Sequence, residues 1–491
     1  MSPFLKYVGL LSAAMLFSSP AFAETLQEAL ASAYNQHPQL KSERARVRET
    51  DESYVQAQAQ GRFQASASAS VGATSSVIQS LSPASFFSPE SIIKSEDAFV
   101  PRSFSISGQK PLYQGGRVRS LKGQAKYGIL SAREGLRNVE QSILLQAATA
   151  YADVIRDEKI AAIRRNNVRV IGRQGDAARD RFDVGVGTRT DIAQADSRMA
   201  SAEIGLARAD AQLQASRAAY IRATGHPPEQ LEPIPKFVLP ESLDQAQRTA
   251  LIYNPQVEAA RYNQDAARFG IDVAESTRKP TISAQTFYQK STDQSSNLIG
   301  QDAIGVSLNL TVPIFTGGRA DSSIRQARAS ETRAKFEVRN IEDALRERVT
   351  TLWAQKVAAE RSLDAARRQV AAADVAFEGV QIELEVGTRD ALDLLNAEQE
   401  VLNARLSVAE AERNLVVVEF QLLNLMGGFD ALSLSLPVEF YDPKVNFEEV
   451  SAYKPLRPLT DAIDEIPEII ENIDLPKPSM PEFLRKKDKT P

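Results

Sequence analysis

The chain has 491 residues, a formal net charge of −5 and no cysteine. The lack of cysteine excludes disulfides, thiolate metal sites, cysteine nucleophiles and a lipid anchor on an N-terminal cysteine. The weakly acidic composition, without a dense basic stripe, gives no reason to expect a nucleic-acid partner. The two histidines, His37 and His226, lie beside prolines and far apart in the sequence, so we interpret them as turn residues rather than metal ligands.

Residues 1–23 have the pattern of a cleavable signal peptide. An apolar run at residues 8–17 follows a lysine, and Ala21 and Ala23 provide small residues just before Glu24. The run is too short to be a membrane-spanning helix, which takes about 20 apolar residues. We therefore expect a mature chain that begins at Glu24 and leaves the cytoplasm without a helical membrane span.

Residues 24–225 predict a first structural repeat. Apolar residues recur every three to four positions up to residue 61, with Pro38 as an early break, and alternating apolar and polar residues follow. A proline-free helical pattern then continues for about 100 Å, up to a V-G-V-G-T turn at residues 184–188. The predicted elements, in chain order, are a helix, a hairpin and two long helices: 24–61, 63–112, 117–183 and 190–224. A proline-rich linker, residues 226–240, ends the repeat.

Residues 241–430 predict a second repeat with the same plan. Its elements are a helix, a hairpin and two long helices, the last three at residues 281–315, 319–385 and 390–426. Residues 431–491 are acidic and rich in proline. We expect this C-terminal tail to be mobile.

Matched motifs indicate that the two repeats arose by internal duplication. P-L-Y-Q-G-G-R begins at Pro111, and P-I-F-T-G-G-R begins at Pro313, 202 residues later. Four further matches share this offset: Val184 with Val386, Gly185 with Gly387, Asp191 with Asp393, and Gly225 with Gly427. Pro38 and Pro255 are 217 residues apart, so the first repeat has 15 extra residues in its hairpin loop. Collinear matches over such a length are the signature of a repeat.

The predicted strands have one apolar and one polar face. Apolar side chains from Ile304 to Ile314 alternate with small or polar ones from Gly305 to Pro313. Strands of roughly 9–11 residues match the length that crosses a bilayer at a tilt. A soluble two-hairpin sheet with its apolar face on a core would give the same pattern. The strands alone leave both interpretations open.

Strand number favours an oligomer if the sheet is in a membrane. Open sheet edges are not tolerated in hydrocarbon, and four strands cannot close a barrel. Two chains would give eight strands, whose interior is filled by side chains, whereas three chains would give twelve and a lumen. Because outer-membrane proteins keep their longer loops outside, we expect the loops at 72–102 and 291–302 at the cell exterior and the long helices in the periplasm.

These motifs resemble the TolC outer-membrane channel family. The resemblance covers residues 24 to about 430 and depends on the duplicated helix–hairpin–helix plan, the twin Gly-Gly-Arg junctions and the twin Val-Gly turns. The wording A-Y-N-Q-H-P-Q-L near the N-terminus is similar to the branch that serves type I protein secretion. The family implies a mainly α fold with membrane β-strands: a homotrimeric twelve-stranded outer-membrane barrel continued by a twelve-helix periplasmic α-barrel. It also implies a periplasmic adaptor and an inner-membrane ABC or proton-driven pump as partners, with no cofactor.

The resemblance assigns roles to residues near the helical tips. Arg389 falls on the family's locking arginine and Asp191 on its partner, so the family implies a clasp that closes the tip. Asp393 and Asn396 fall on the two positions of a pore ring, which uses aspartates in the family. Here Asn396 and Leu384 depart from the family pattern. The adaptor-docking turns would comprise Val184, Gly185, Val386, Gly387 and Thr388. The barrel-to-helix junctions would comprise Gly115, Gly116, Arg117, Gly317, Gly318 and Arg319.

The sequence thus predicts an exit duct in the outer membrane that passively conducts secreted proteins, drugs or both. An enzyme is disfavoured because no catalytic or phosphate-binding motif occurs at a strand–helix junction. The alternative is a periplasmic coiled-coil adaptor or a surface structural protein, which would also have long helices and a signal peptide. Such proteins lack duplicated amphipathic hairpins.

Overall fold

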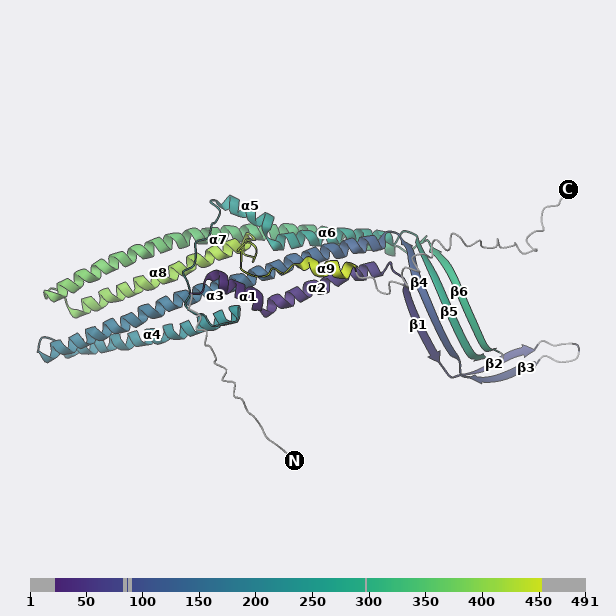
Figure 1. The fold of residues 1–491 in the computed structure, drawn as a ribbon, viewed down its shortest axis with the longest axis horizontal. Helices are drawn as coiled ribbons and strands as arrows, with labels where there is room; N and C mark the ends of the chain where they lie inside the picture. The colour runs from purple at the N-terminus through teal and green to yellow at the C-terminus, as the bar shows by residue number, and fades with distance from the viewer. Residues whose placement is uncertain (1–22, 83–85, 87–90, 296–297, 453–491) are drawn as a thin grey trace, which may run out of the picture. The chain divides into compact units, whose positions relative to one another are not determined.

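The structure, a computed structural model, describes residues 23–82, 86, 91–295 and 298–452. The predicted signal peptide and most of the predicted tail lie outside this range. The chain forms two compact units (Figure 1). Unit 1 comprises the residues up to Thr50, Tyr127–Asp265 and Thr332–Pro443, and unit 2 comprises Asp51–Lys126, Ala266–Glu331 and the residues from Lys444. No helix in the described ranges is both long and apolar enough to cross a membrane.

Unit 1 consists of helices. Their bounds are α1 (Leu26–Gln36), α2 (Pro38–Ala59), α3 (Arg117–Asp183), α4 (Arg189–Thr224), α5 (Leu243–Tyr253), α6 (Pro255–Ser276), α7 (Arg319–Glu385) and α8 (Ala391–Leu425). Helices α2, α3, α6 and α7 continue into unit 2. Within unit 1, α3 and α4 lie side by side as one helical hairpin, and α7 and α8 form a second (Figure 1).

Local sequence signals explain the helix boundaries. Thr25 caps α1 in a capping box with Glu28, which satisfies backbone N–H groups that the first turn leaves free. Pro38 and Pro255 occupy the first positions of α2 and α6, where a missing N–H costs nothing. Gly225 ends α4 in the left-handed conformation. The breaks therefore arise from caps and prolines, while the proline-free stretches run on as 67-residue helices.

Two of the hydrophobic clusters in unit 1 lie around the short helices α1 and α5. In the first, Leu30 and Tyr34 of α1 pack with Tyr151 of α3, Tyr220 of α4 and Phe420 of α8. Full burial of side chains of this size stabilises the fold by about 2 kcal/mol each. Tyr151 Oη lies 2.8 Å from the carbonyl oxygens of Glu24 and Glu232, and burial raises the pKa of Tyr151 above its ordinary value.

The second cluster repeats this arrangement around α5. Ala246 and Ala250 of α5 pack with Val349 of α7 and Leu422 of α8. The end of α8 also closes tightly on α5. A Cβ at Gly427, whose φ is +74°, would lie 2.2 Å from the carbonyl oxygen of Tyr253, so only glycine fits there.

Unit 2 contains an antiparallel four-stranded sheet in the order β1-β4-β5-β6 and a two-stranded sheet β2-β3. The strands are β1 (Gln64–Val71), β2 (Thr74–Ser82), β3 (Ser91–Phe99), β4 (Arg102–Gln114), β5 (Thr281–Ser295) and β6 (Leu298–Thr311). Strands β2 and β3 pair with each other, as do β5 and β6, whereas β1 pairs with β4. The pairing of β4 with β5 joins the two repeats in one sheet (Figure 1). Strands β1 and β6 are its two outer strands.

Two predicted loops are wrong. Strands β2 and β3 occupy most of the predicted loop 72–102, and β5 and β6 extend into the predicted loop 291–302. These segments show little alternation in the sequence and gain their strand structure from pairing with each other. The hairpin region of the first repeat is longer than that of the second, and many of its additional residues form the strands β2 and β3.

The predicted tail is also partly wrong, because residues 431–452 are packed. Ala431 and Leu436 are buried in the first cluster. A further helix, α9 (Pro443–Ala452), lies against α2 within unit 2, with the Phe447 ring edge-on to Tyr54 at 5.2 Å. Contacts with distant helices order this segment despite its prolines.

Candidate functional site

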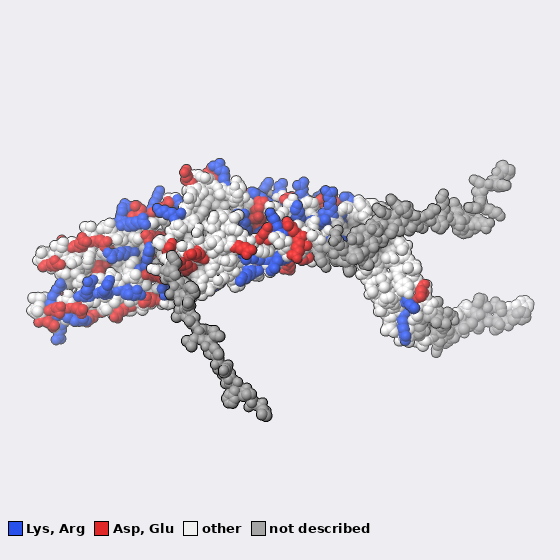
Figure 2. Space-filling model, in the orientation of Figure 1, with Lys and Arg blue, Asp and Glu red and all other residues white. Residues whose placement is uncertain are grey.

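The four-stranded sheet has two chemically different faces. Cross-strand partners place the aliphatic side chains of β6 on one face, and four of them are largely exposed, from 82% for Ile304 and 75% for Val306 to more than half for Leu308 and Leu310. Few charged side chains lie on this sheet, in contrast to the helices of unit 1 (Figure 2). An exposed aliphatic face of this kind is typical of contact with lipid or protein rather than water.

The opposite face is lined with hydroxyl groups. Three pairs of serines face one another across β1 and β4 at Oγ–Oγ distances of 2.7–2.9 Å: Ser66 with Ser107, Ser68 with Ser105, and Ser70 with Ser103. Ser283, Ser307 and Asn309 continue this face on β5 and β6. The sheet thus combines one face that is aliphatic along β6 with another that is mainly polar and uncharged, interrupted by Phe287 opposite Ser107.

Glycine pairs mark the two junctions where strands give way to long helices. Gly115 and Gly116 before Arg117 have φ values of +62° and +86°, and Gly317 and Gly318 before Arg319 have +61° and +83°. Both pairs therefore use the left-handed conformation that other residues avoid. Only the first junction is crowded: a Cβ at Gly115 would lie 2.6 Å from Cβ of Lys279, whereas the other three glycines have open space.

The first tip turn joins α3 to α4. Gly185 has a φ of +81°, and Val184 and Gly185 donate to carbonyl oxygens of the last turn of α3. Thr188 then caps α4: its Oγ1 accepts from the Asp191 N–H at 3.2 Å, and its own N–H donates to the Asp191 carboxylate at 2.9 Å. These bonds with Thr188 lower the pKa of Asp191. The Asp191 carboxylate is thus engaged within its own turn.

The second tip turn joins α7 to α8 and has the same backbone plan. Gly387 has a φ of +80°, and the N–H of Val386 and the N–H and hydroxyl of Thr388 donate back to α7. Arg389 Nε donates to Glu383 Oε2 at 2.9 Å, and its Nη1 donates to Asp393 Oδ2 at 3.4 Å. The contact with Glu383, followed by that with Asp393, raises the pKa of Arg389.

The structure brings together some of the predicted site residues and not others. Arg389 meets Asp393, but neither contacts Asp191 in this chain; the clasp between Arg389 and Asp191 stays a prediction. Asn396 accepts a hydrogen bond from Arg198 at 3.2 Å, which ties α8 to α4. The pore ring of Asp393 and Asn396 needs further copies of the chain and also stays a prediction.

One unusual side chain near the tips, that of Glu398 on α8, was not predicted from the sequence. Its side chain is only 7% exposed, and its Oε2 has no hydrogen-bond partner among the described residues. One turn earlier, Leu395 packs with Ile171 of α3 and Ala202 of α4. Burial raises the pKa of Glu398 to about 7, although Arg173 acts in the opposite direction. In the sequence, Glu398 lies among polar residues such as Asn396, Gln399 and Glu400. Its burial results from the packing of helices that are distant in the sequence.

Comparison with known families identifies a match over most of the chain. A family model described as "Outer membrane efflux protein" matches residues 29–226 and 247–428. Outer membrane efflux protein BepC of Brucella suis biovar 1 (strain 1330) is 34% identical over 449 residues, which cover 90% of this chain and 93% of that protein.

A second relative is named for protein secretion. Alkaline protease secretion protein AprF of Pseudomonas aeruginosa (strain PAO1) is 25% identical over 345 residues, which cover 68% of this chain and 71% of that protein. Among solved structures, the outer membrane protein VceC of Vibrio cholerae has a TM-score of 0.66 at 20% identity and covers 82% of this chain and 96% of that one.

Proposed function

The chain belongs to the outer membrane efflux protein family, and we propose how this outer-membrane exit duct, whose helical part lies in the periplasm, is assembled. Three copies contribute their four-stranded sheets to one twelve-stranded barrel and their long helices to a twelve-helix periplasmic tunnel. A periplasmic adaptor docks at the tip turns, and an inner-membrane ABC or proton-driven pump supplies the cargo and the energy.

The observation that carries this assembly is the sheet itself. Its outer strands β1 and β6 have no further strand partner among the described residues, and one face is aliphatic and exposed. A sheet with this face in hydrocarbon must pair both edges, because unpaired backbone groups there cost several kcal/mol each. Pairing β1 of one copy with β6 of the next closes a ring. Three copies make the smallest ring with an open lumen.

The polar face then lines the lumen. Serine and asparagine side chains can hydrogen-bond water and carry no charge, so they neither bind nor repel ions strongly. Selection by charge would then occur in the helical tunnel, where carboxylates such as Asp393 recur around the threefold axis. The aliphatic face outside and the hydroxyl face inside match the alternation of a membrane barrel.

The second part of the proposal concerns the molecules that the duct conducts. BepC is named for efflux and AprF for secretion of a protease, so both small molecules and unfolded proteins are candidate cargoes. A deletion strain scored at once for drug susceptibility and for a secreted protein would decide between them. Loss of one phenotype alone would assign the cargo class, and loss of neither would contradict the role in export.

Designed cross-links test the assembly directly. The chain has no cysteine, so an introduced pair reports only its own contact. Ser68→Cys on β1 with a cysteine at Ser307 on β6, or two residues to either side, should link neighbouring copies and give covalent trimers in outer-membrane fractions. The control pair Ser68→Cys with Ser105→Cys joins partners within one chain and should give monomers only. A water-soluble monomer, or dimers without trimers, would overturn the proposal.

A further inference from the structure

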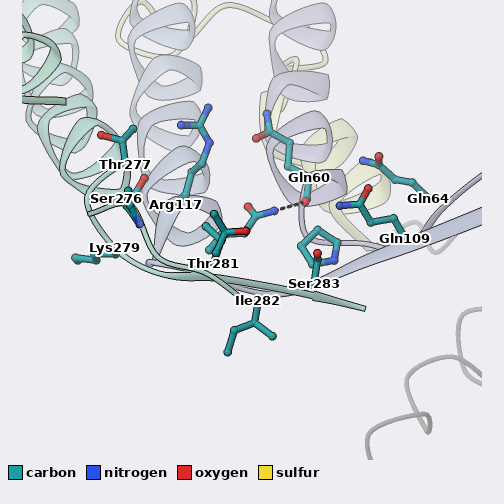
Figure 3. A pocket seen from close by; sticks show the side chains of 14 residues that line it. Gln60, Gln64, Gln109, Arg117, Ser276, Thr277, Lys279, Thr281, Ile282 and Ser283 are labelled. Carbon is teal, nitrogen blue, oxygen red and sulfur yellow. Dashed lines mark hydrogen bonds between the residues drawn. The ribbon is translucent and has the colours of Figure 1, made fainter. Parts of the chain in front are cut away.

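A polar pocket of about 580 Å³ lies in unit 2 where the sheet meets the helices. Its floor is the polar face of the sheet, with Gln64, Gln109 and Ser283, and its walls are the start of α3 and the end of α6 (Figure 3). Ile282 points away from these polar side chains in the same view. The pocket is therefore on the hydroxyl-lined side of the sheet.

The lining has cations and no carboxylate. Arg117 and Lys279 both line the pocket, and none of its lining residues is Asp or Glu. Within the described part of the chain, neither cation forms an ion pair or a side-chain hydrogen bond. The nearby Arg278 differs, because it pairs with Asp321. A concave site with two unneutralised cations and no competing anion favours an oxyanion ligand.

Neutral hydrogen-bond donors complete the site. The side-chain amides of Gln64 and Gln109 have no partner among the described residues, whereas Gln114 donates to the carbonyl oxygen of Gln60 at 3.4 Å (Figure 3). Gln64 and Gln109 lie at the end of the pocket away from Lys279 (Figure 3), so the cations can bind an oxyanion while the amides offer neutral hydrogen bonds to another part of the same molecule.

The geometry of the first junction creates this pocket. Gly115 lets the start of α3 approach the α6–β5 turn, since its missing Cβ would collide with Lys279 and lie 3.0 Å from the Ser276 carbonyl oxygen. A register shift between Pro111 and Tyr113 interrupts the regular pairing of β4 with β5 at the same point. The second junction has nothing within 4 Å of its glycines. The site therefore forms at the first junction, between residues of both repeats.

We propose that the pocket between Arg117, Lys279 and the polar face of the sheet binds the oxyanion group of a phosphate- or carboxylate-bearing molecule. That the pocket opens into the duct rests on the proposed function. Three such sites would then encircle the lumen at the level where strands give way to helices, and would hold anionic groups there.

Titration of the purified full-length protein with inorganic phosphate, followed by calorimetry, tests the site. Arg117→Gln with Lys279→Gln should weaken phosphate binding at least about tenfold, since charged hydrogen bonds dominate such affinities. Arg119→Gln removes an exposed cation from the same helix start but outside the pocket lining, and should leave the affinity unchanged. No binding to the wild type, or equal affinity in all variants, would overturn the site.

Two further measurements separate the alternatives. Short-chain phosphatidylglycerol in place of inorganic phosphate identifies the source: tighter binding of the lipid assigns a headgroup, and equal binding assigns a free oxyanion. Conductance in chloride and heat-resistant trimers report channel assembly without using the pocket. Normal trimers and conductance with no phosphate binding would therefore refute the site and leave the proposed function intact.

Discussion

Replacing Glu398 by glutamine should change the pH dependence of stability. The amide keeps the shape of the side chain and removes the carboxylate that is buried on α8 without a hydrogen bond at Oε2. Burial raises the pKa of Glu398 from its ordinary 4.5 to about 7. The difference corresponds to about 3 kcal/mol between the charged and neutral forms.

The sign follows from proton binding. Below pH 4.5 the carboxyl is protonated in both the folded and the unfolded chain, so it costs no stability. Between pH 4.5 and 7 the folded chain keeps a proton that the unfolded chain loses, so stability falls as pH rises. Above pH 7 the charged group destabilises the fold by the full amount, and Glu398→Gln should therefore stabilise it there.

Thermal unfolding followed by circular dichroism in detergent measures the effect. At pH 8 the midpoint of Glu398→Gln should exceed that of the wild type on the order of 5 °C, and most of this difference should disappear at pH 5. Glu400→Gln removes an exposed carboxylate from the same helix and should leave the pH profile unchanged. If the wild type and Glu398→Gln show the same pH dependence, the carboxylate is not held in the environment described.

Three other substitutions test the close packing and the tips. Gly427→Ala places a Cβ 2.2 Å from the Tyr253 carbonyl oxygen and should cost at least about 2 kcal/mol of stability. The control Gly175→Ala adds a Cβ on α3 that has no neighbour within 4 Å and should stabilise the fold slightly. Equal melting points of the two variants would contradict this. Arg389→Ser removes the guanidinium that braces the second tip turn and should raise single-channel conductance in planar bilayers, an unchanged conductance counting against its locking role. Asp393→Ala should weaken cation preference, seen as a smaller reversal potential under a salt gradient; an unaltered potential would exclude the ring.

Sequence patterns predict the elements whose signals are local. The helix starts at Arg117 and Arg319 follow glycine pairs, and the twin tip turns share a left-handed glycine at Gly185 and Gly387. Such positions are set by the conformations that neighbouring residues allow, so a single sequence contains them. The duplication helped as well, because each junction could be compared with its counterpart.

The features that escaped prediction depend on contacts between distant segments. Strands β2 and β3 have no regular alternation and form by pairing with each other. Leu436 is buried against helices some 300 residues away along the chain, although its segment is rich in proline. Arg389 pairs with Glu383 and Asp393, which lie close to it in the sequence. A motif alignment that pairs Arg389 with Asp191 does not show that these nearer carboxylates compete for the guanidinium.

The serine pairs across β1 and β4 have a mechanical consequence. A hydroxyl group can rotate to donate or to accept a hydrogen bond. Each serine pair can therefore hydrogen-bond to water or to either kind of polar group. Under the proposed assembly, a polypeptide that passes along these serine pairs would meet hydroxyl groups and bound water rather than fixed charges. A wall of this chemistry would let one channel conduct cargoes of different kinds.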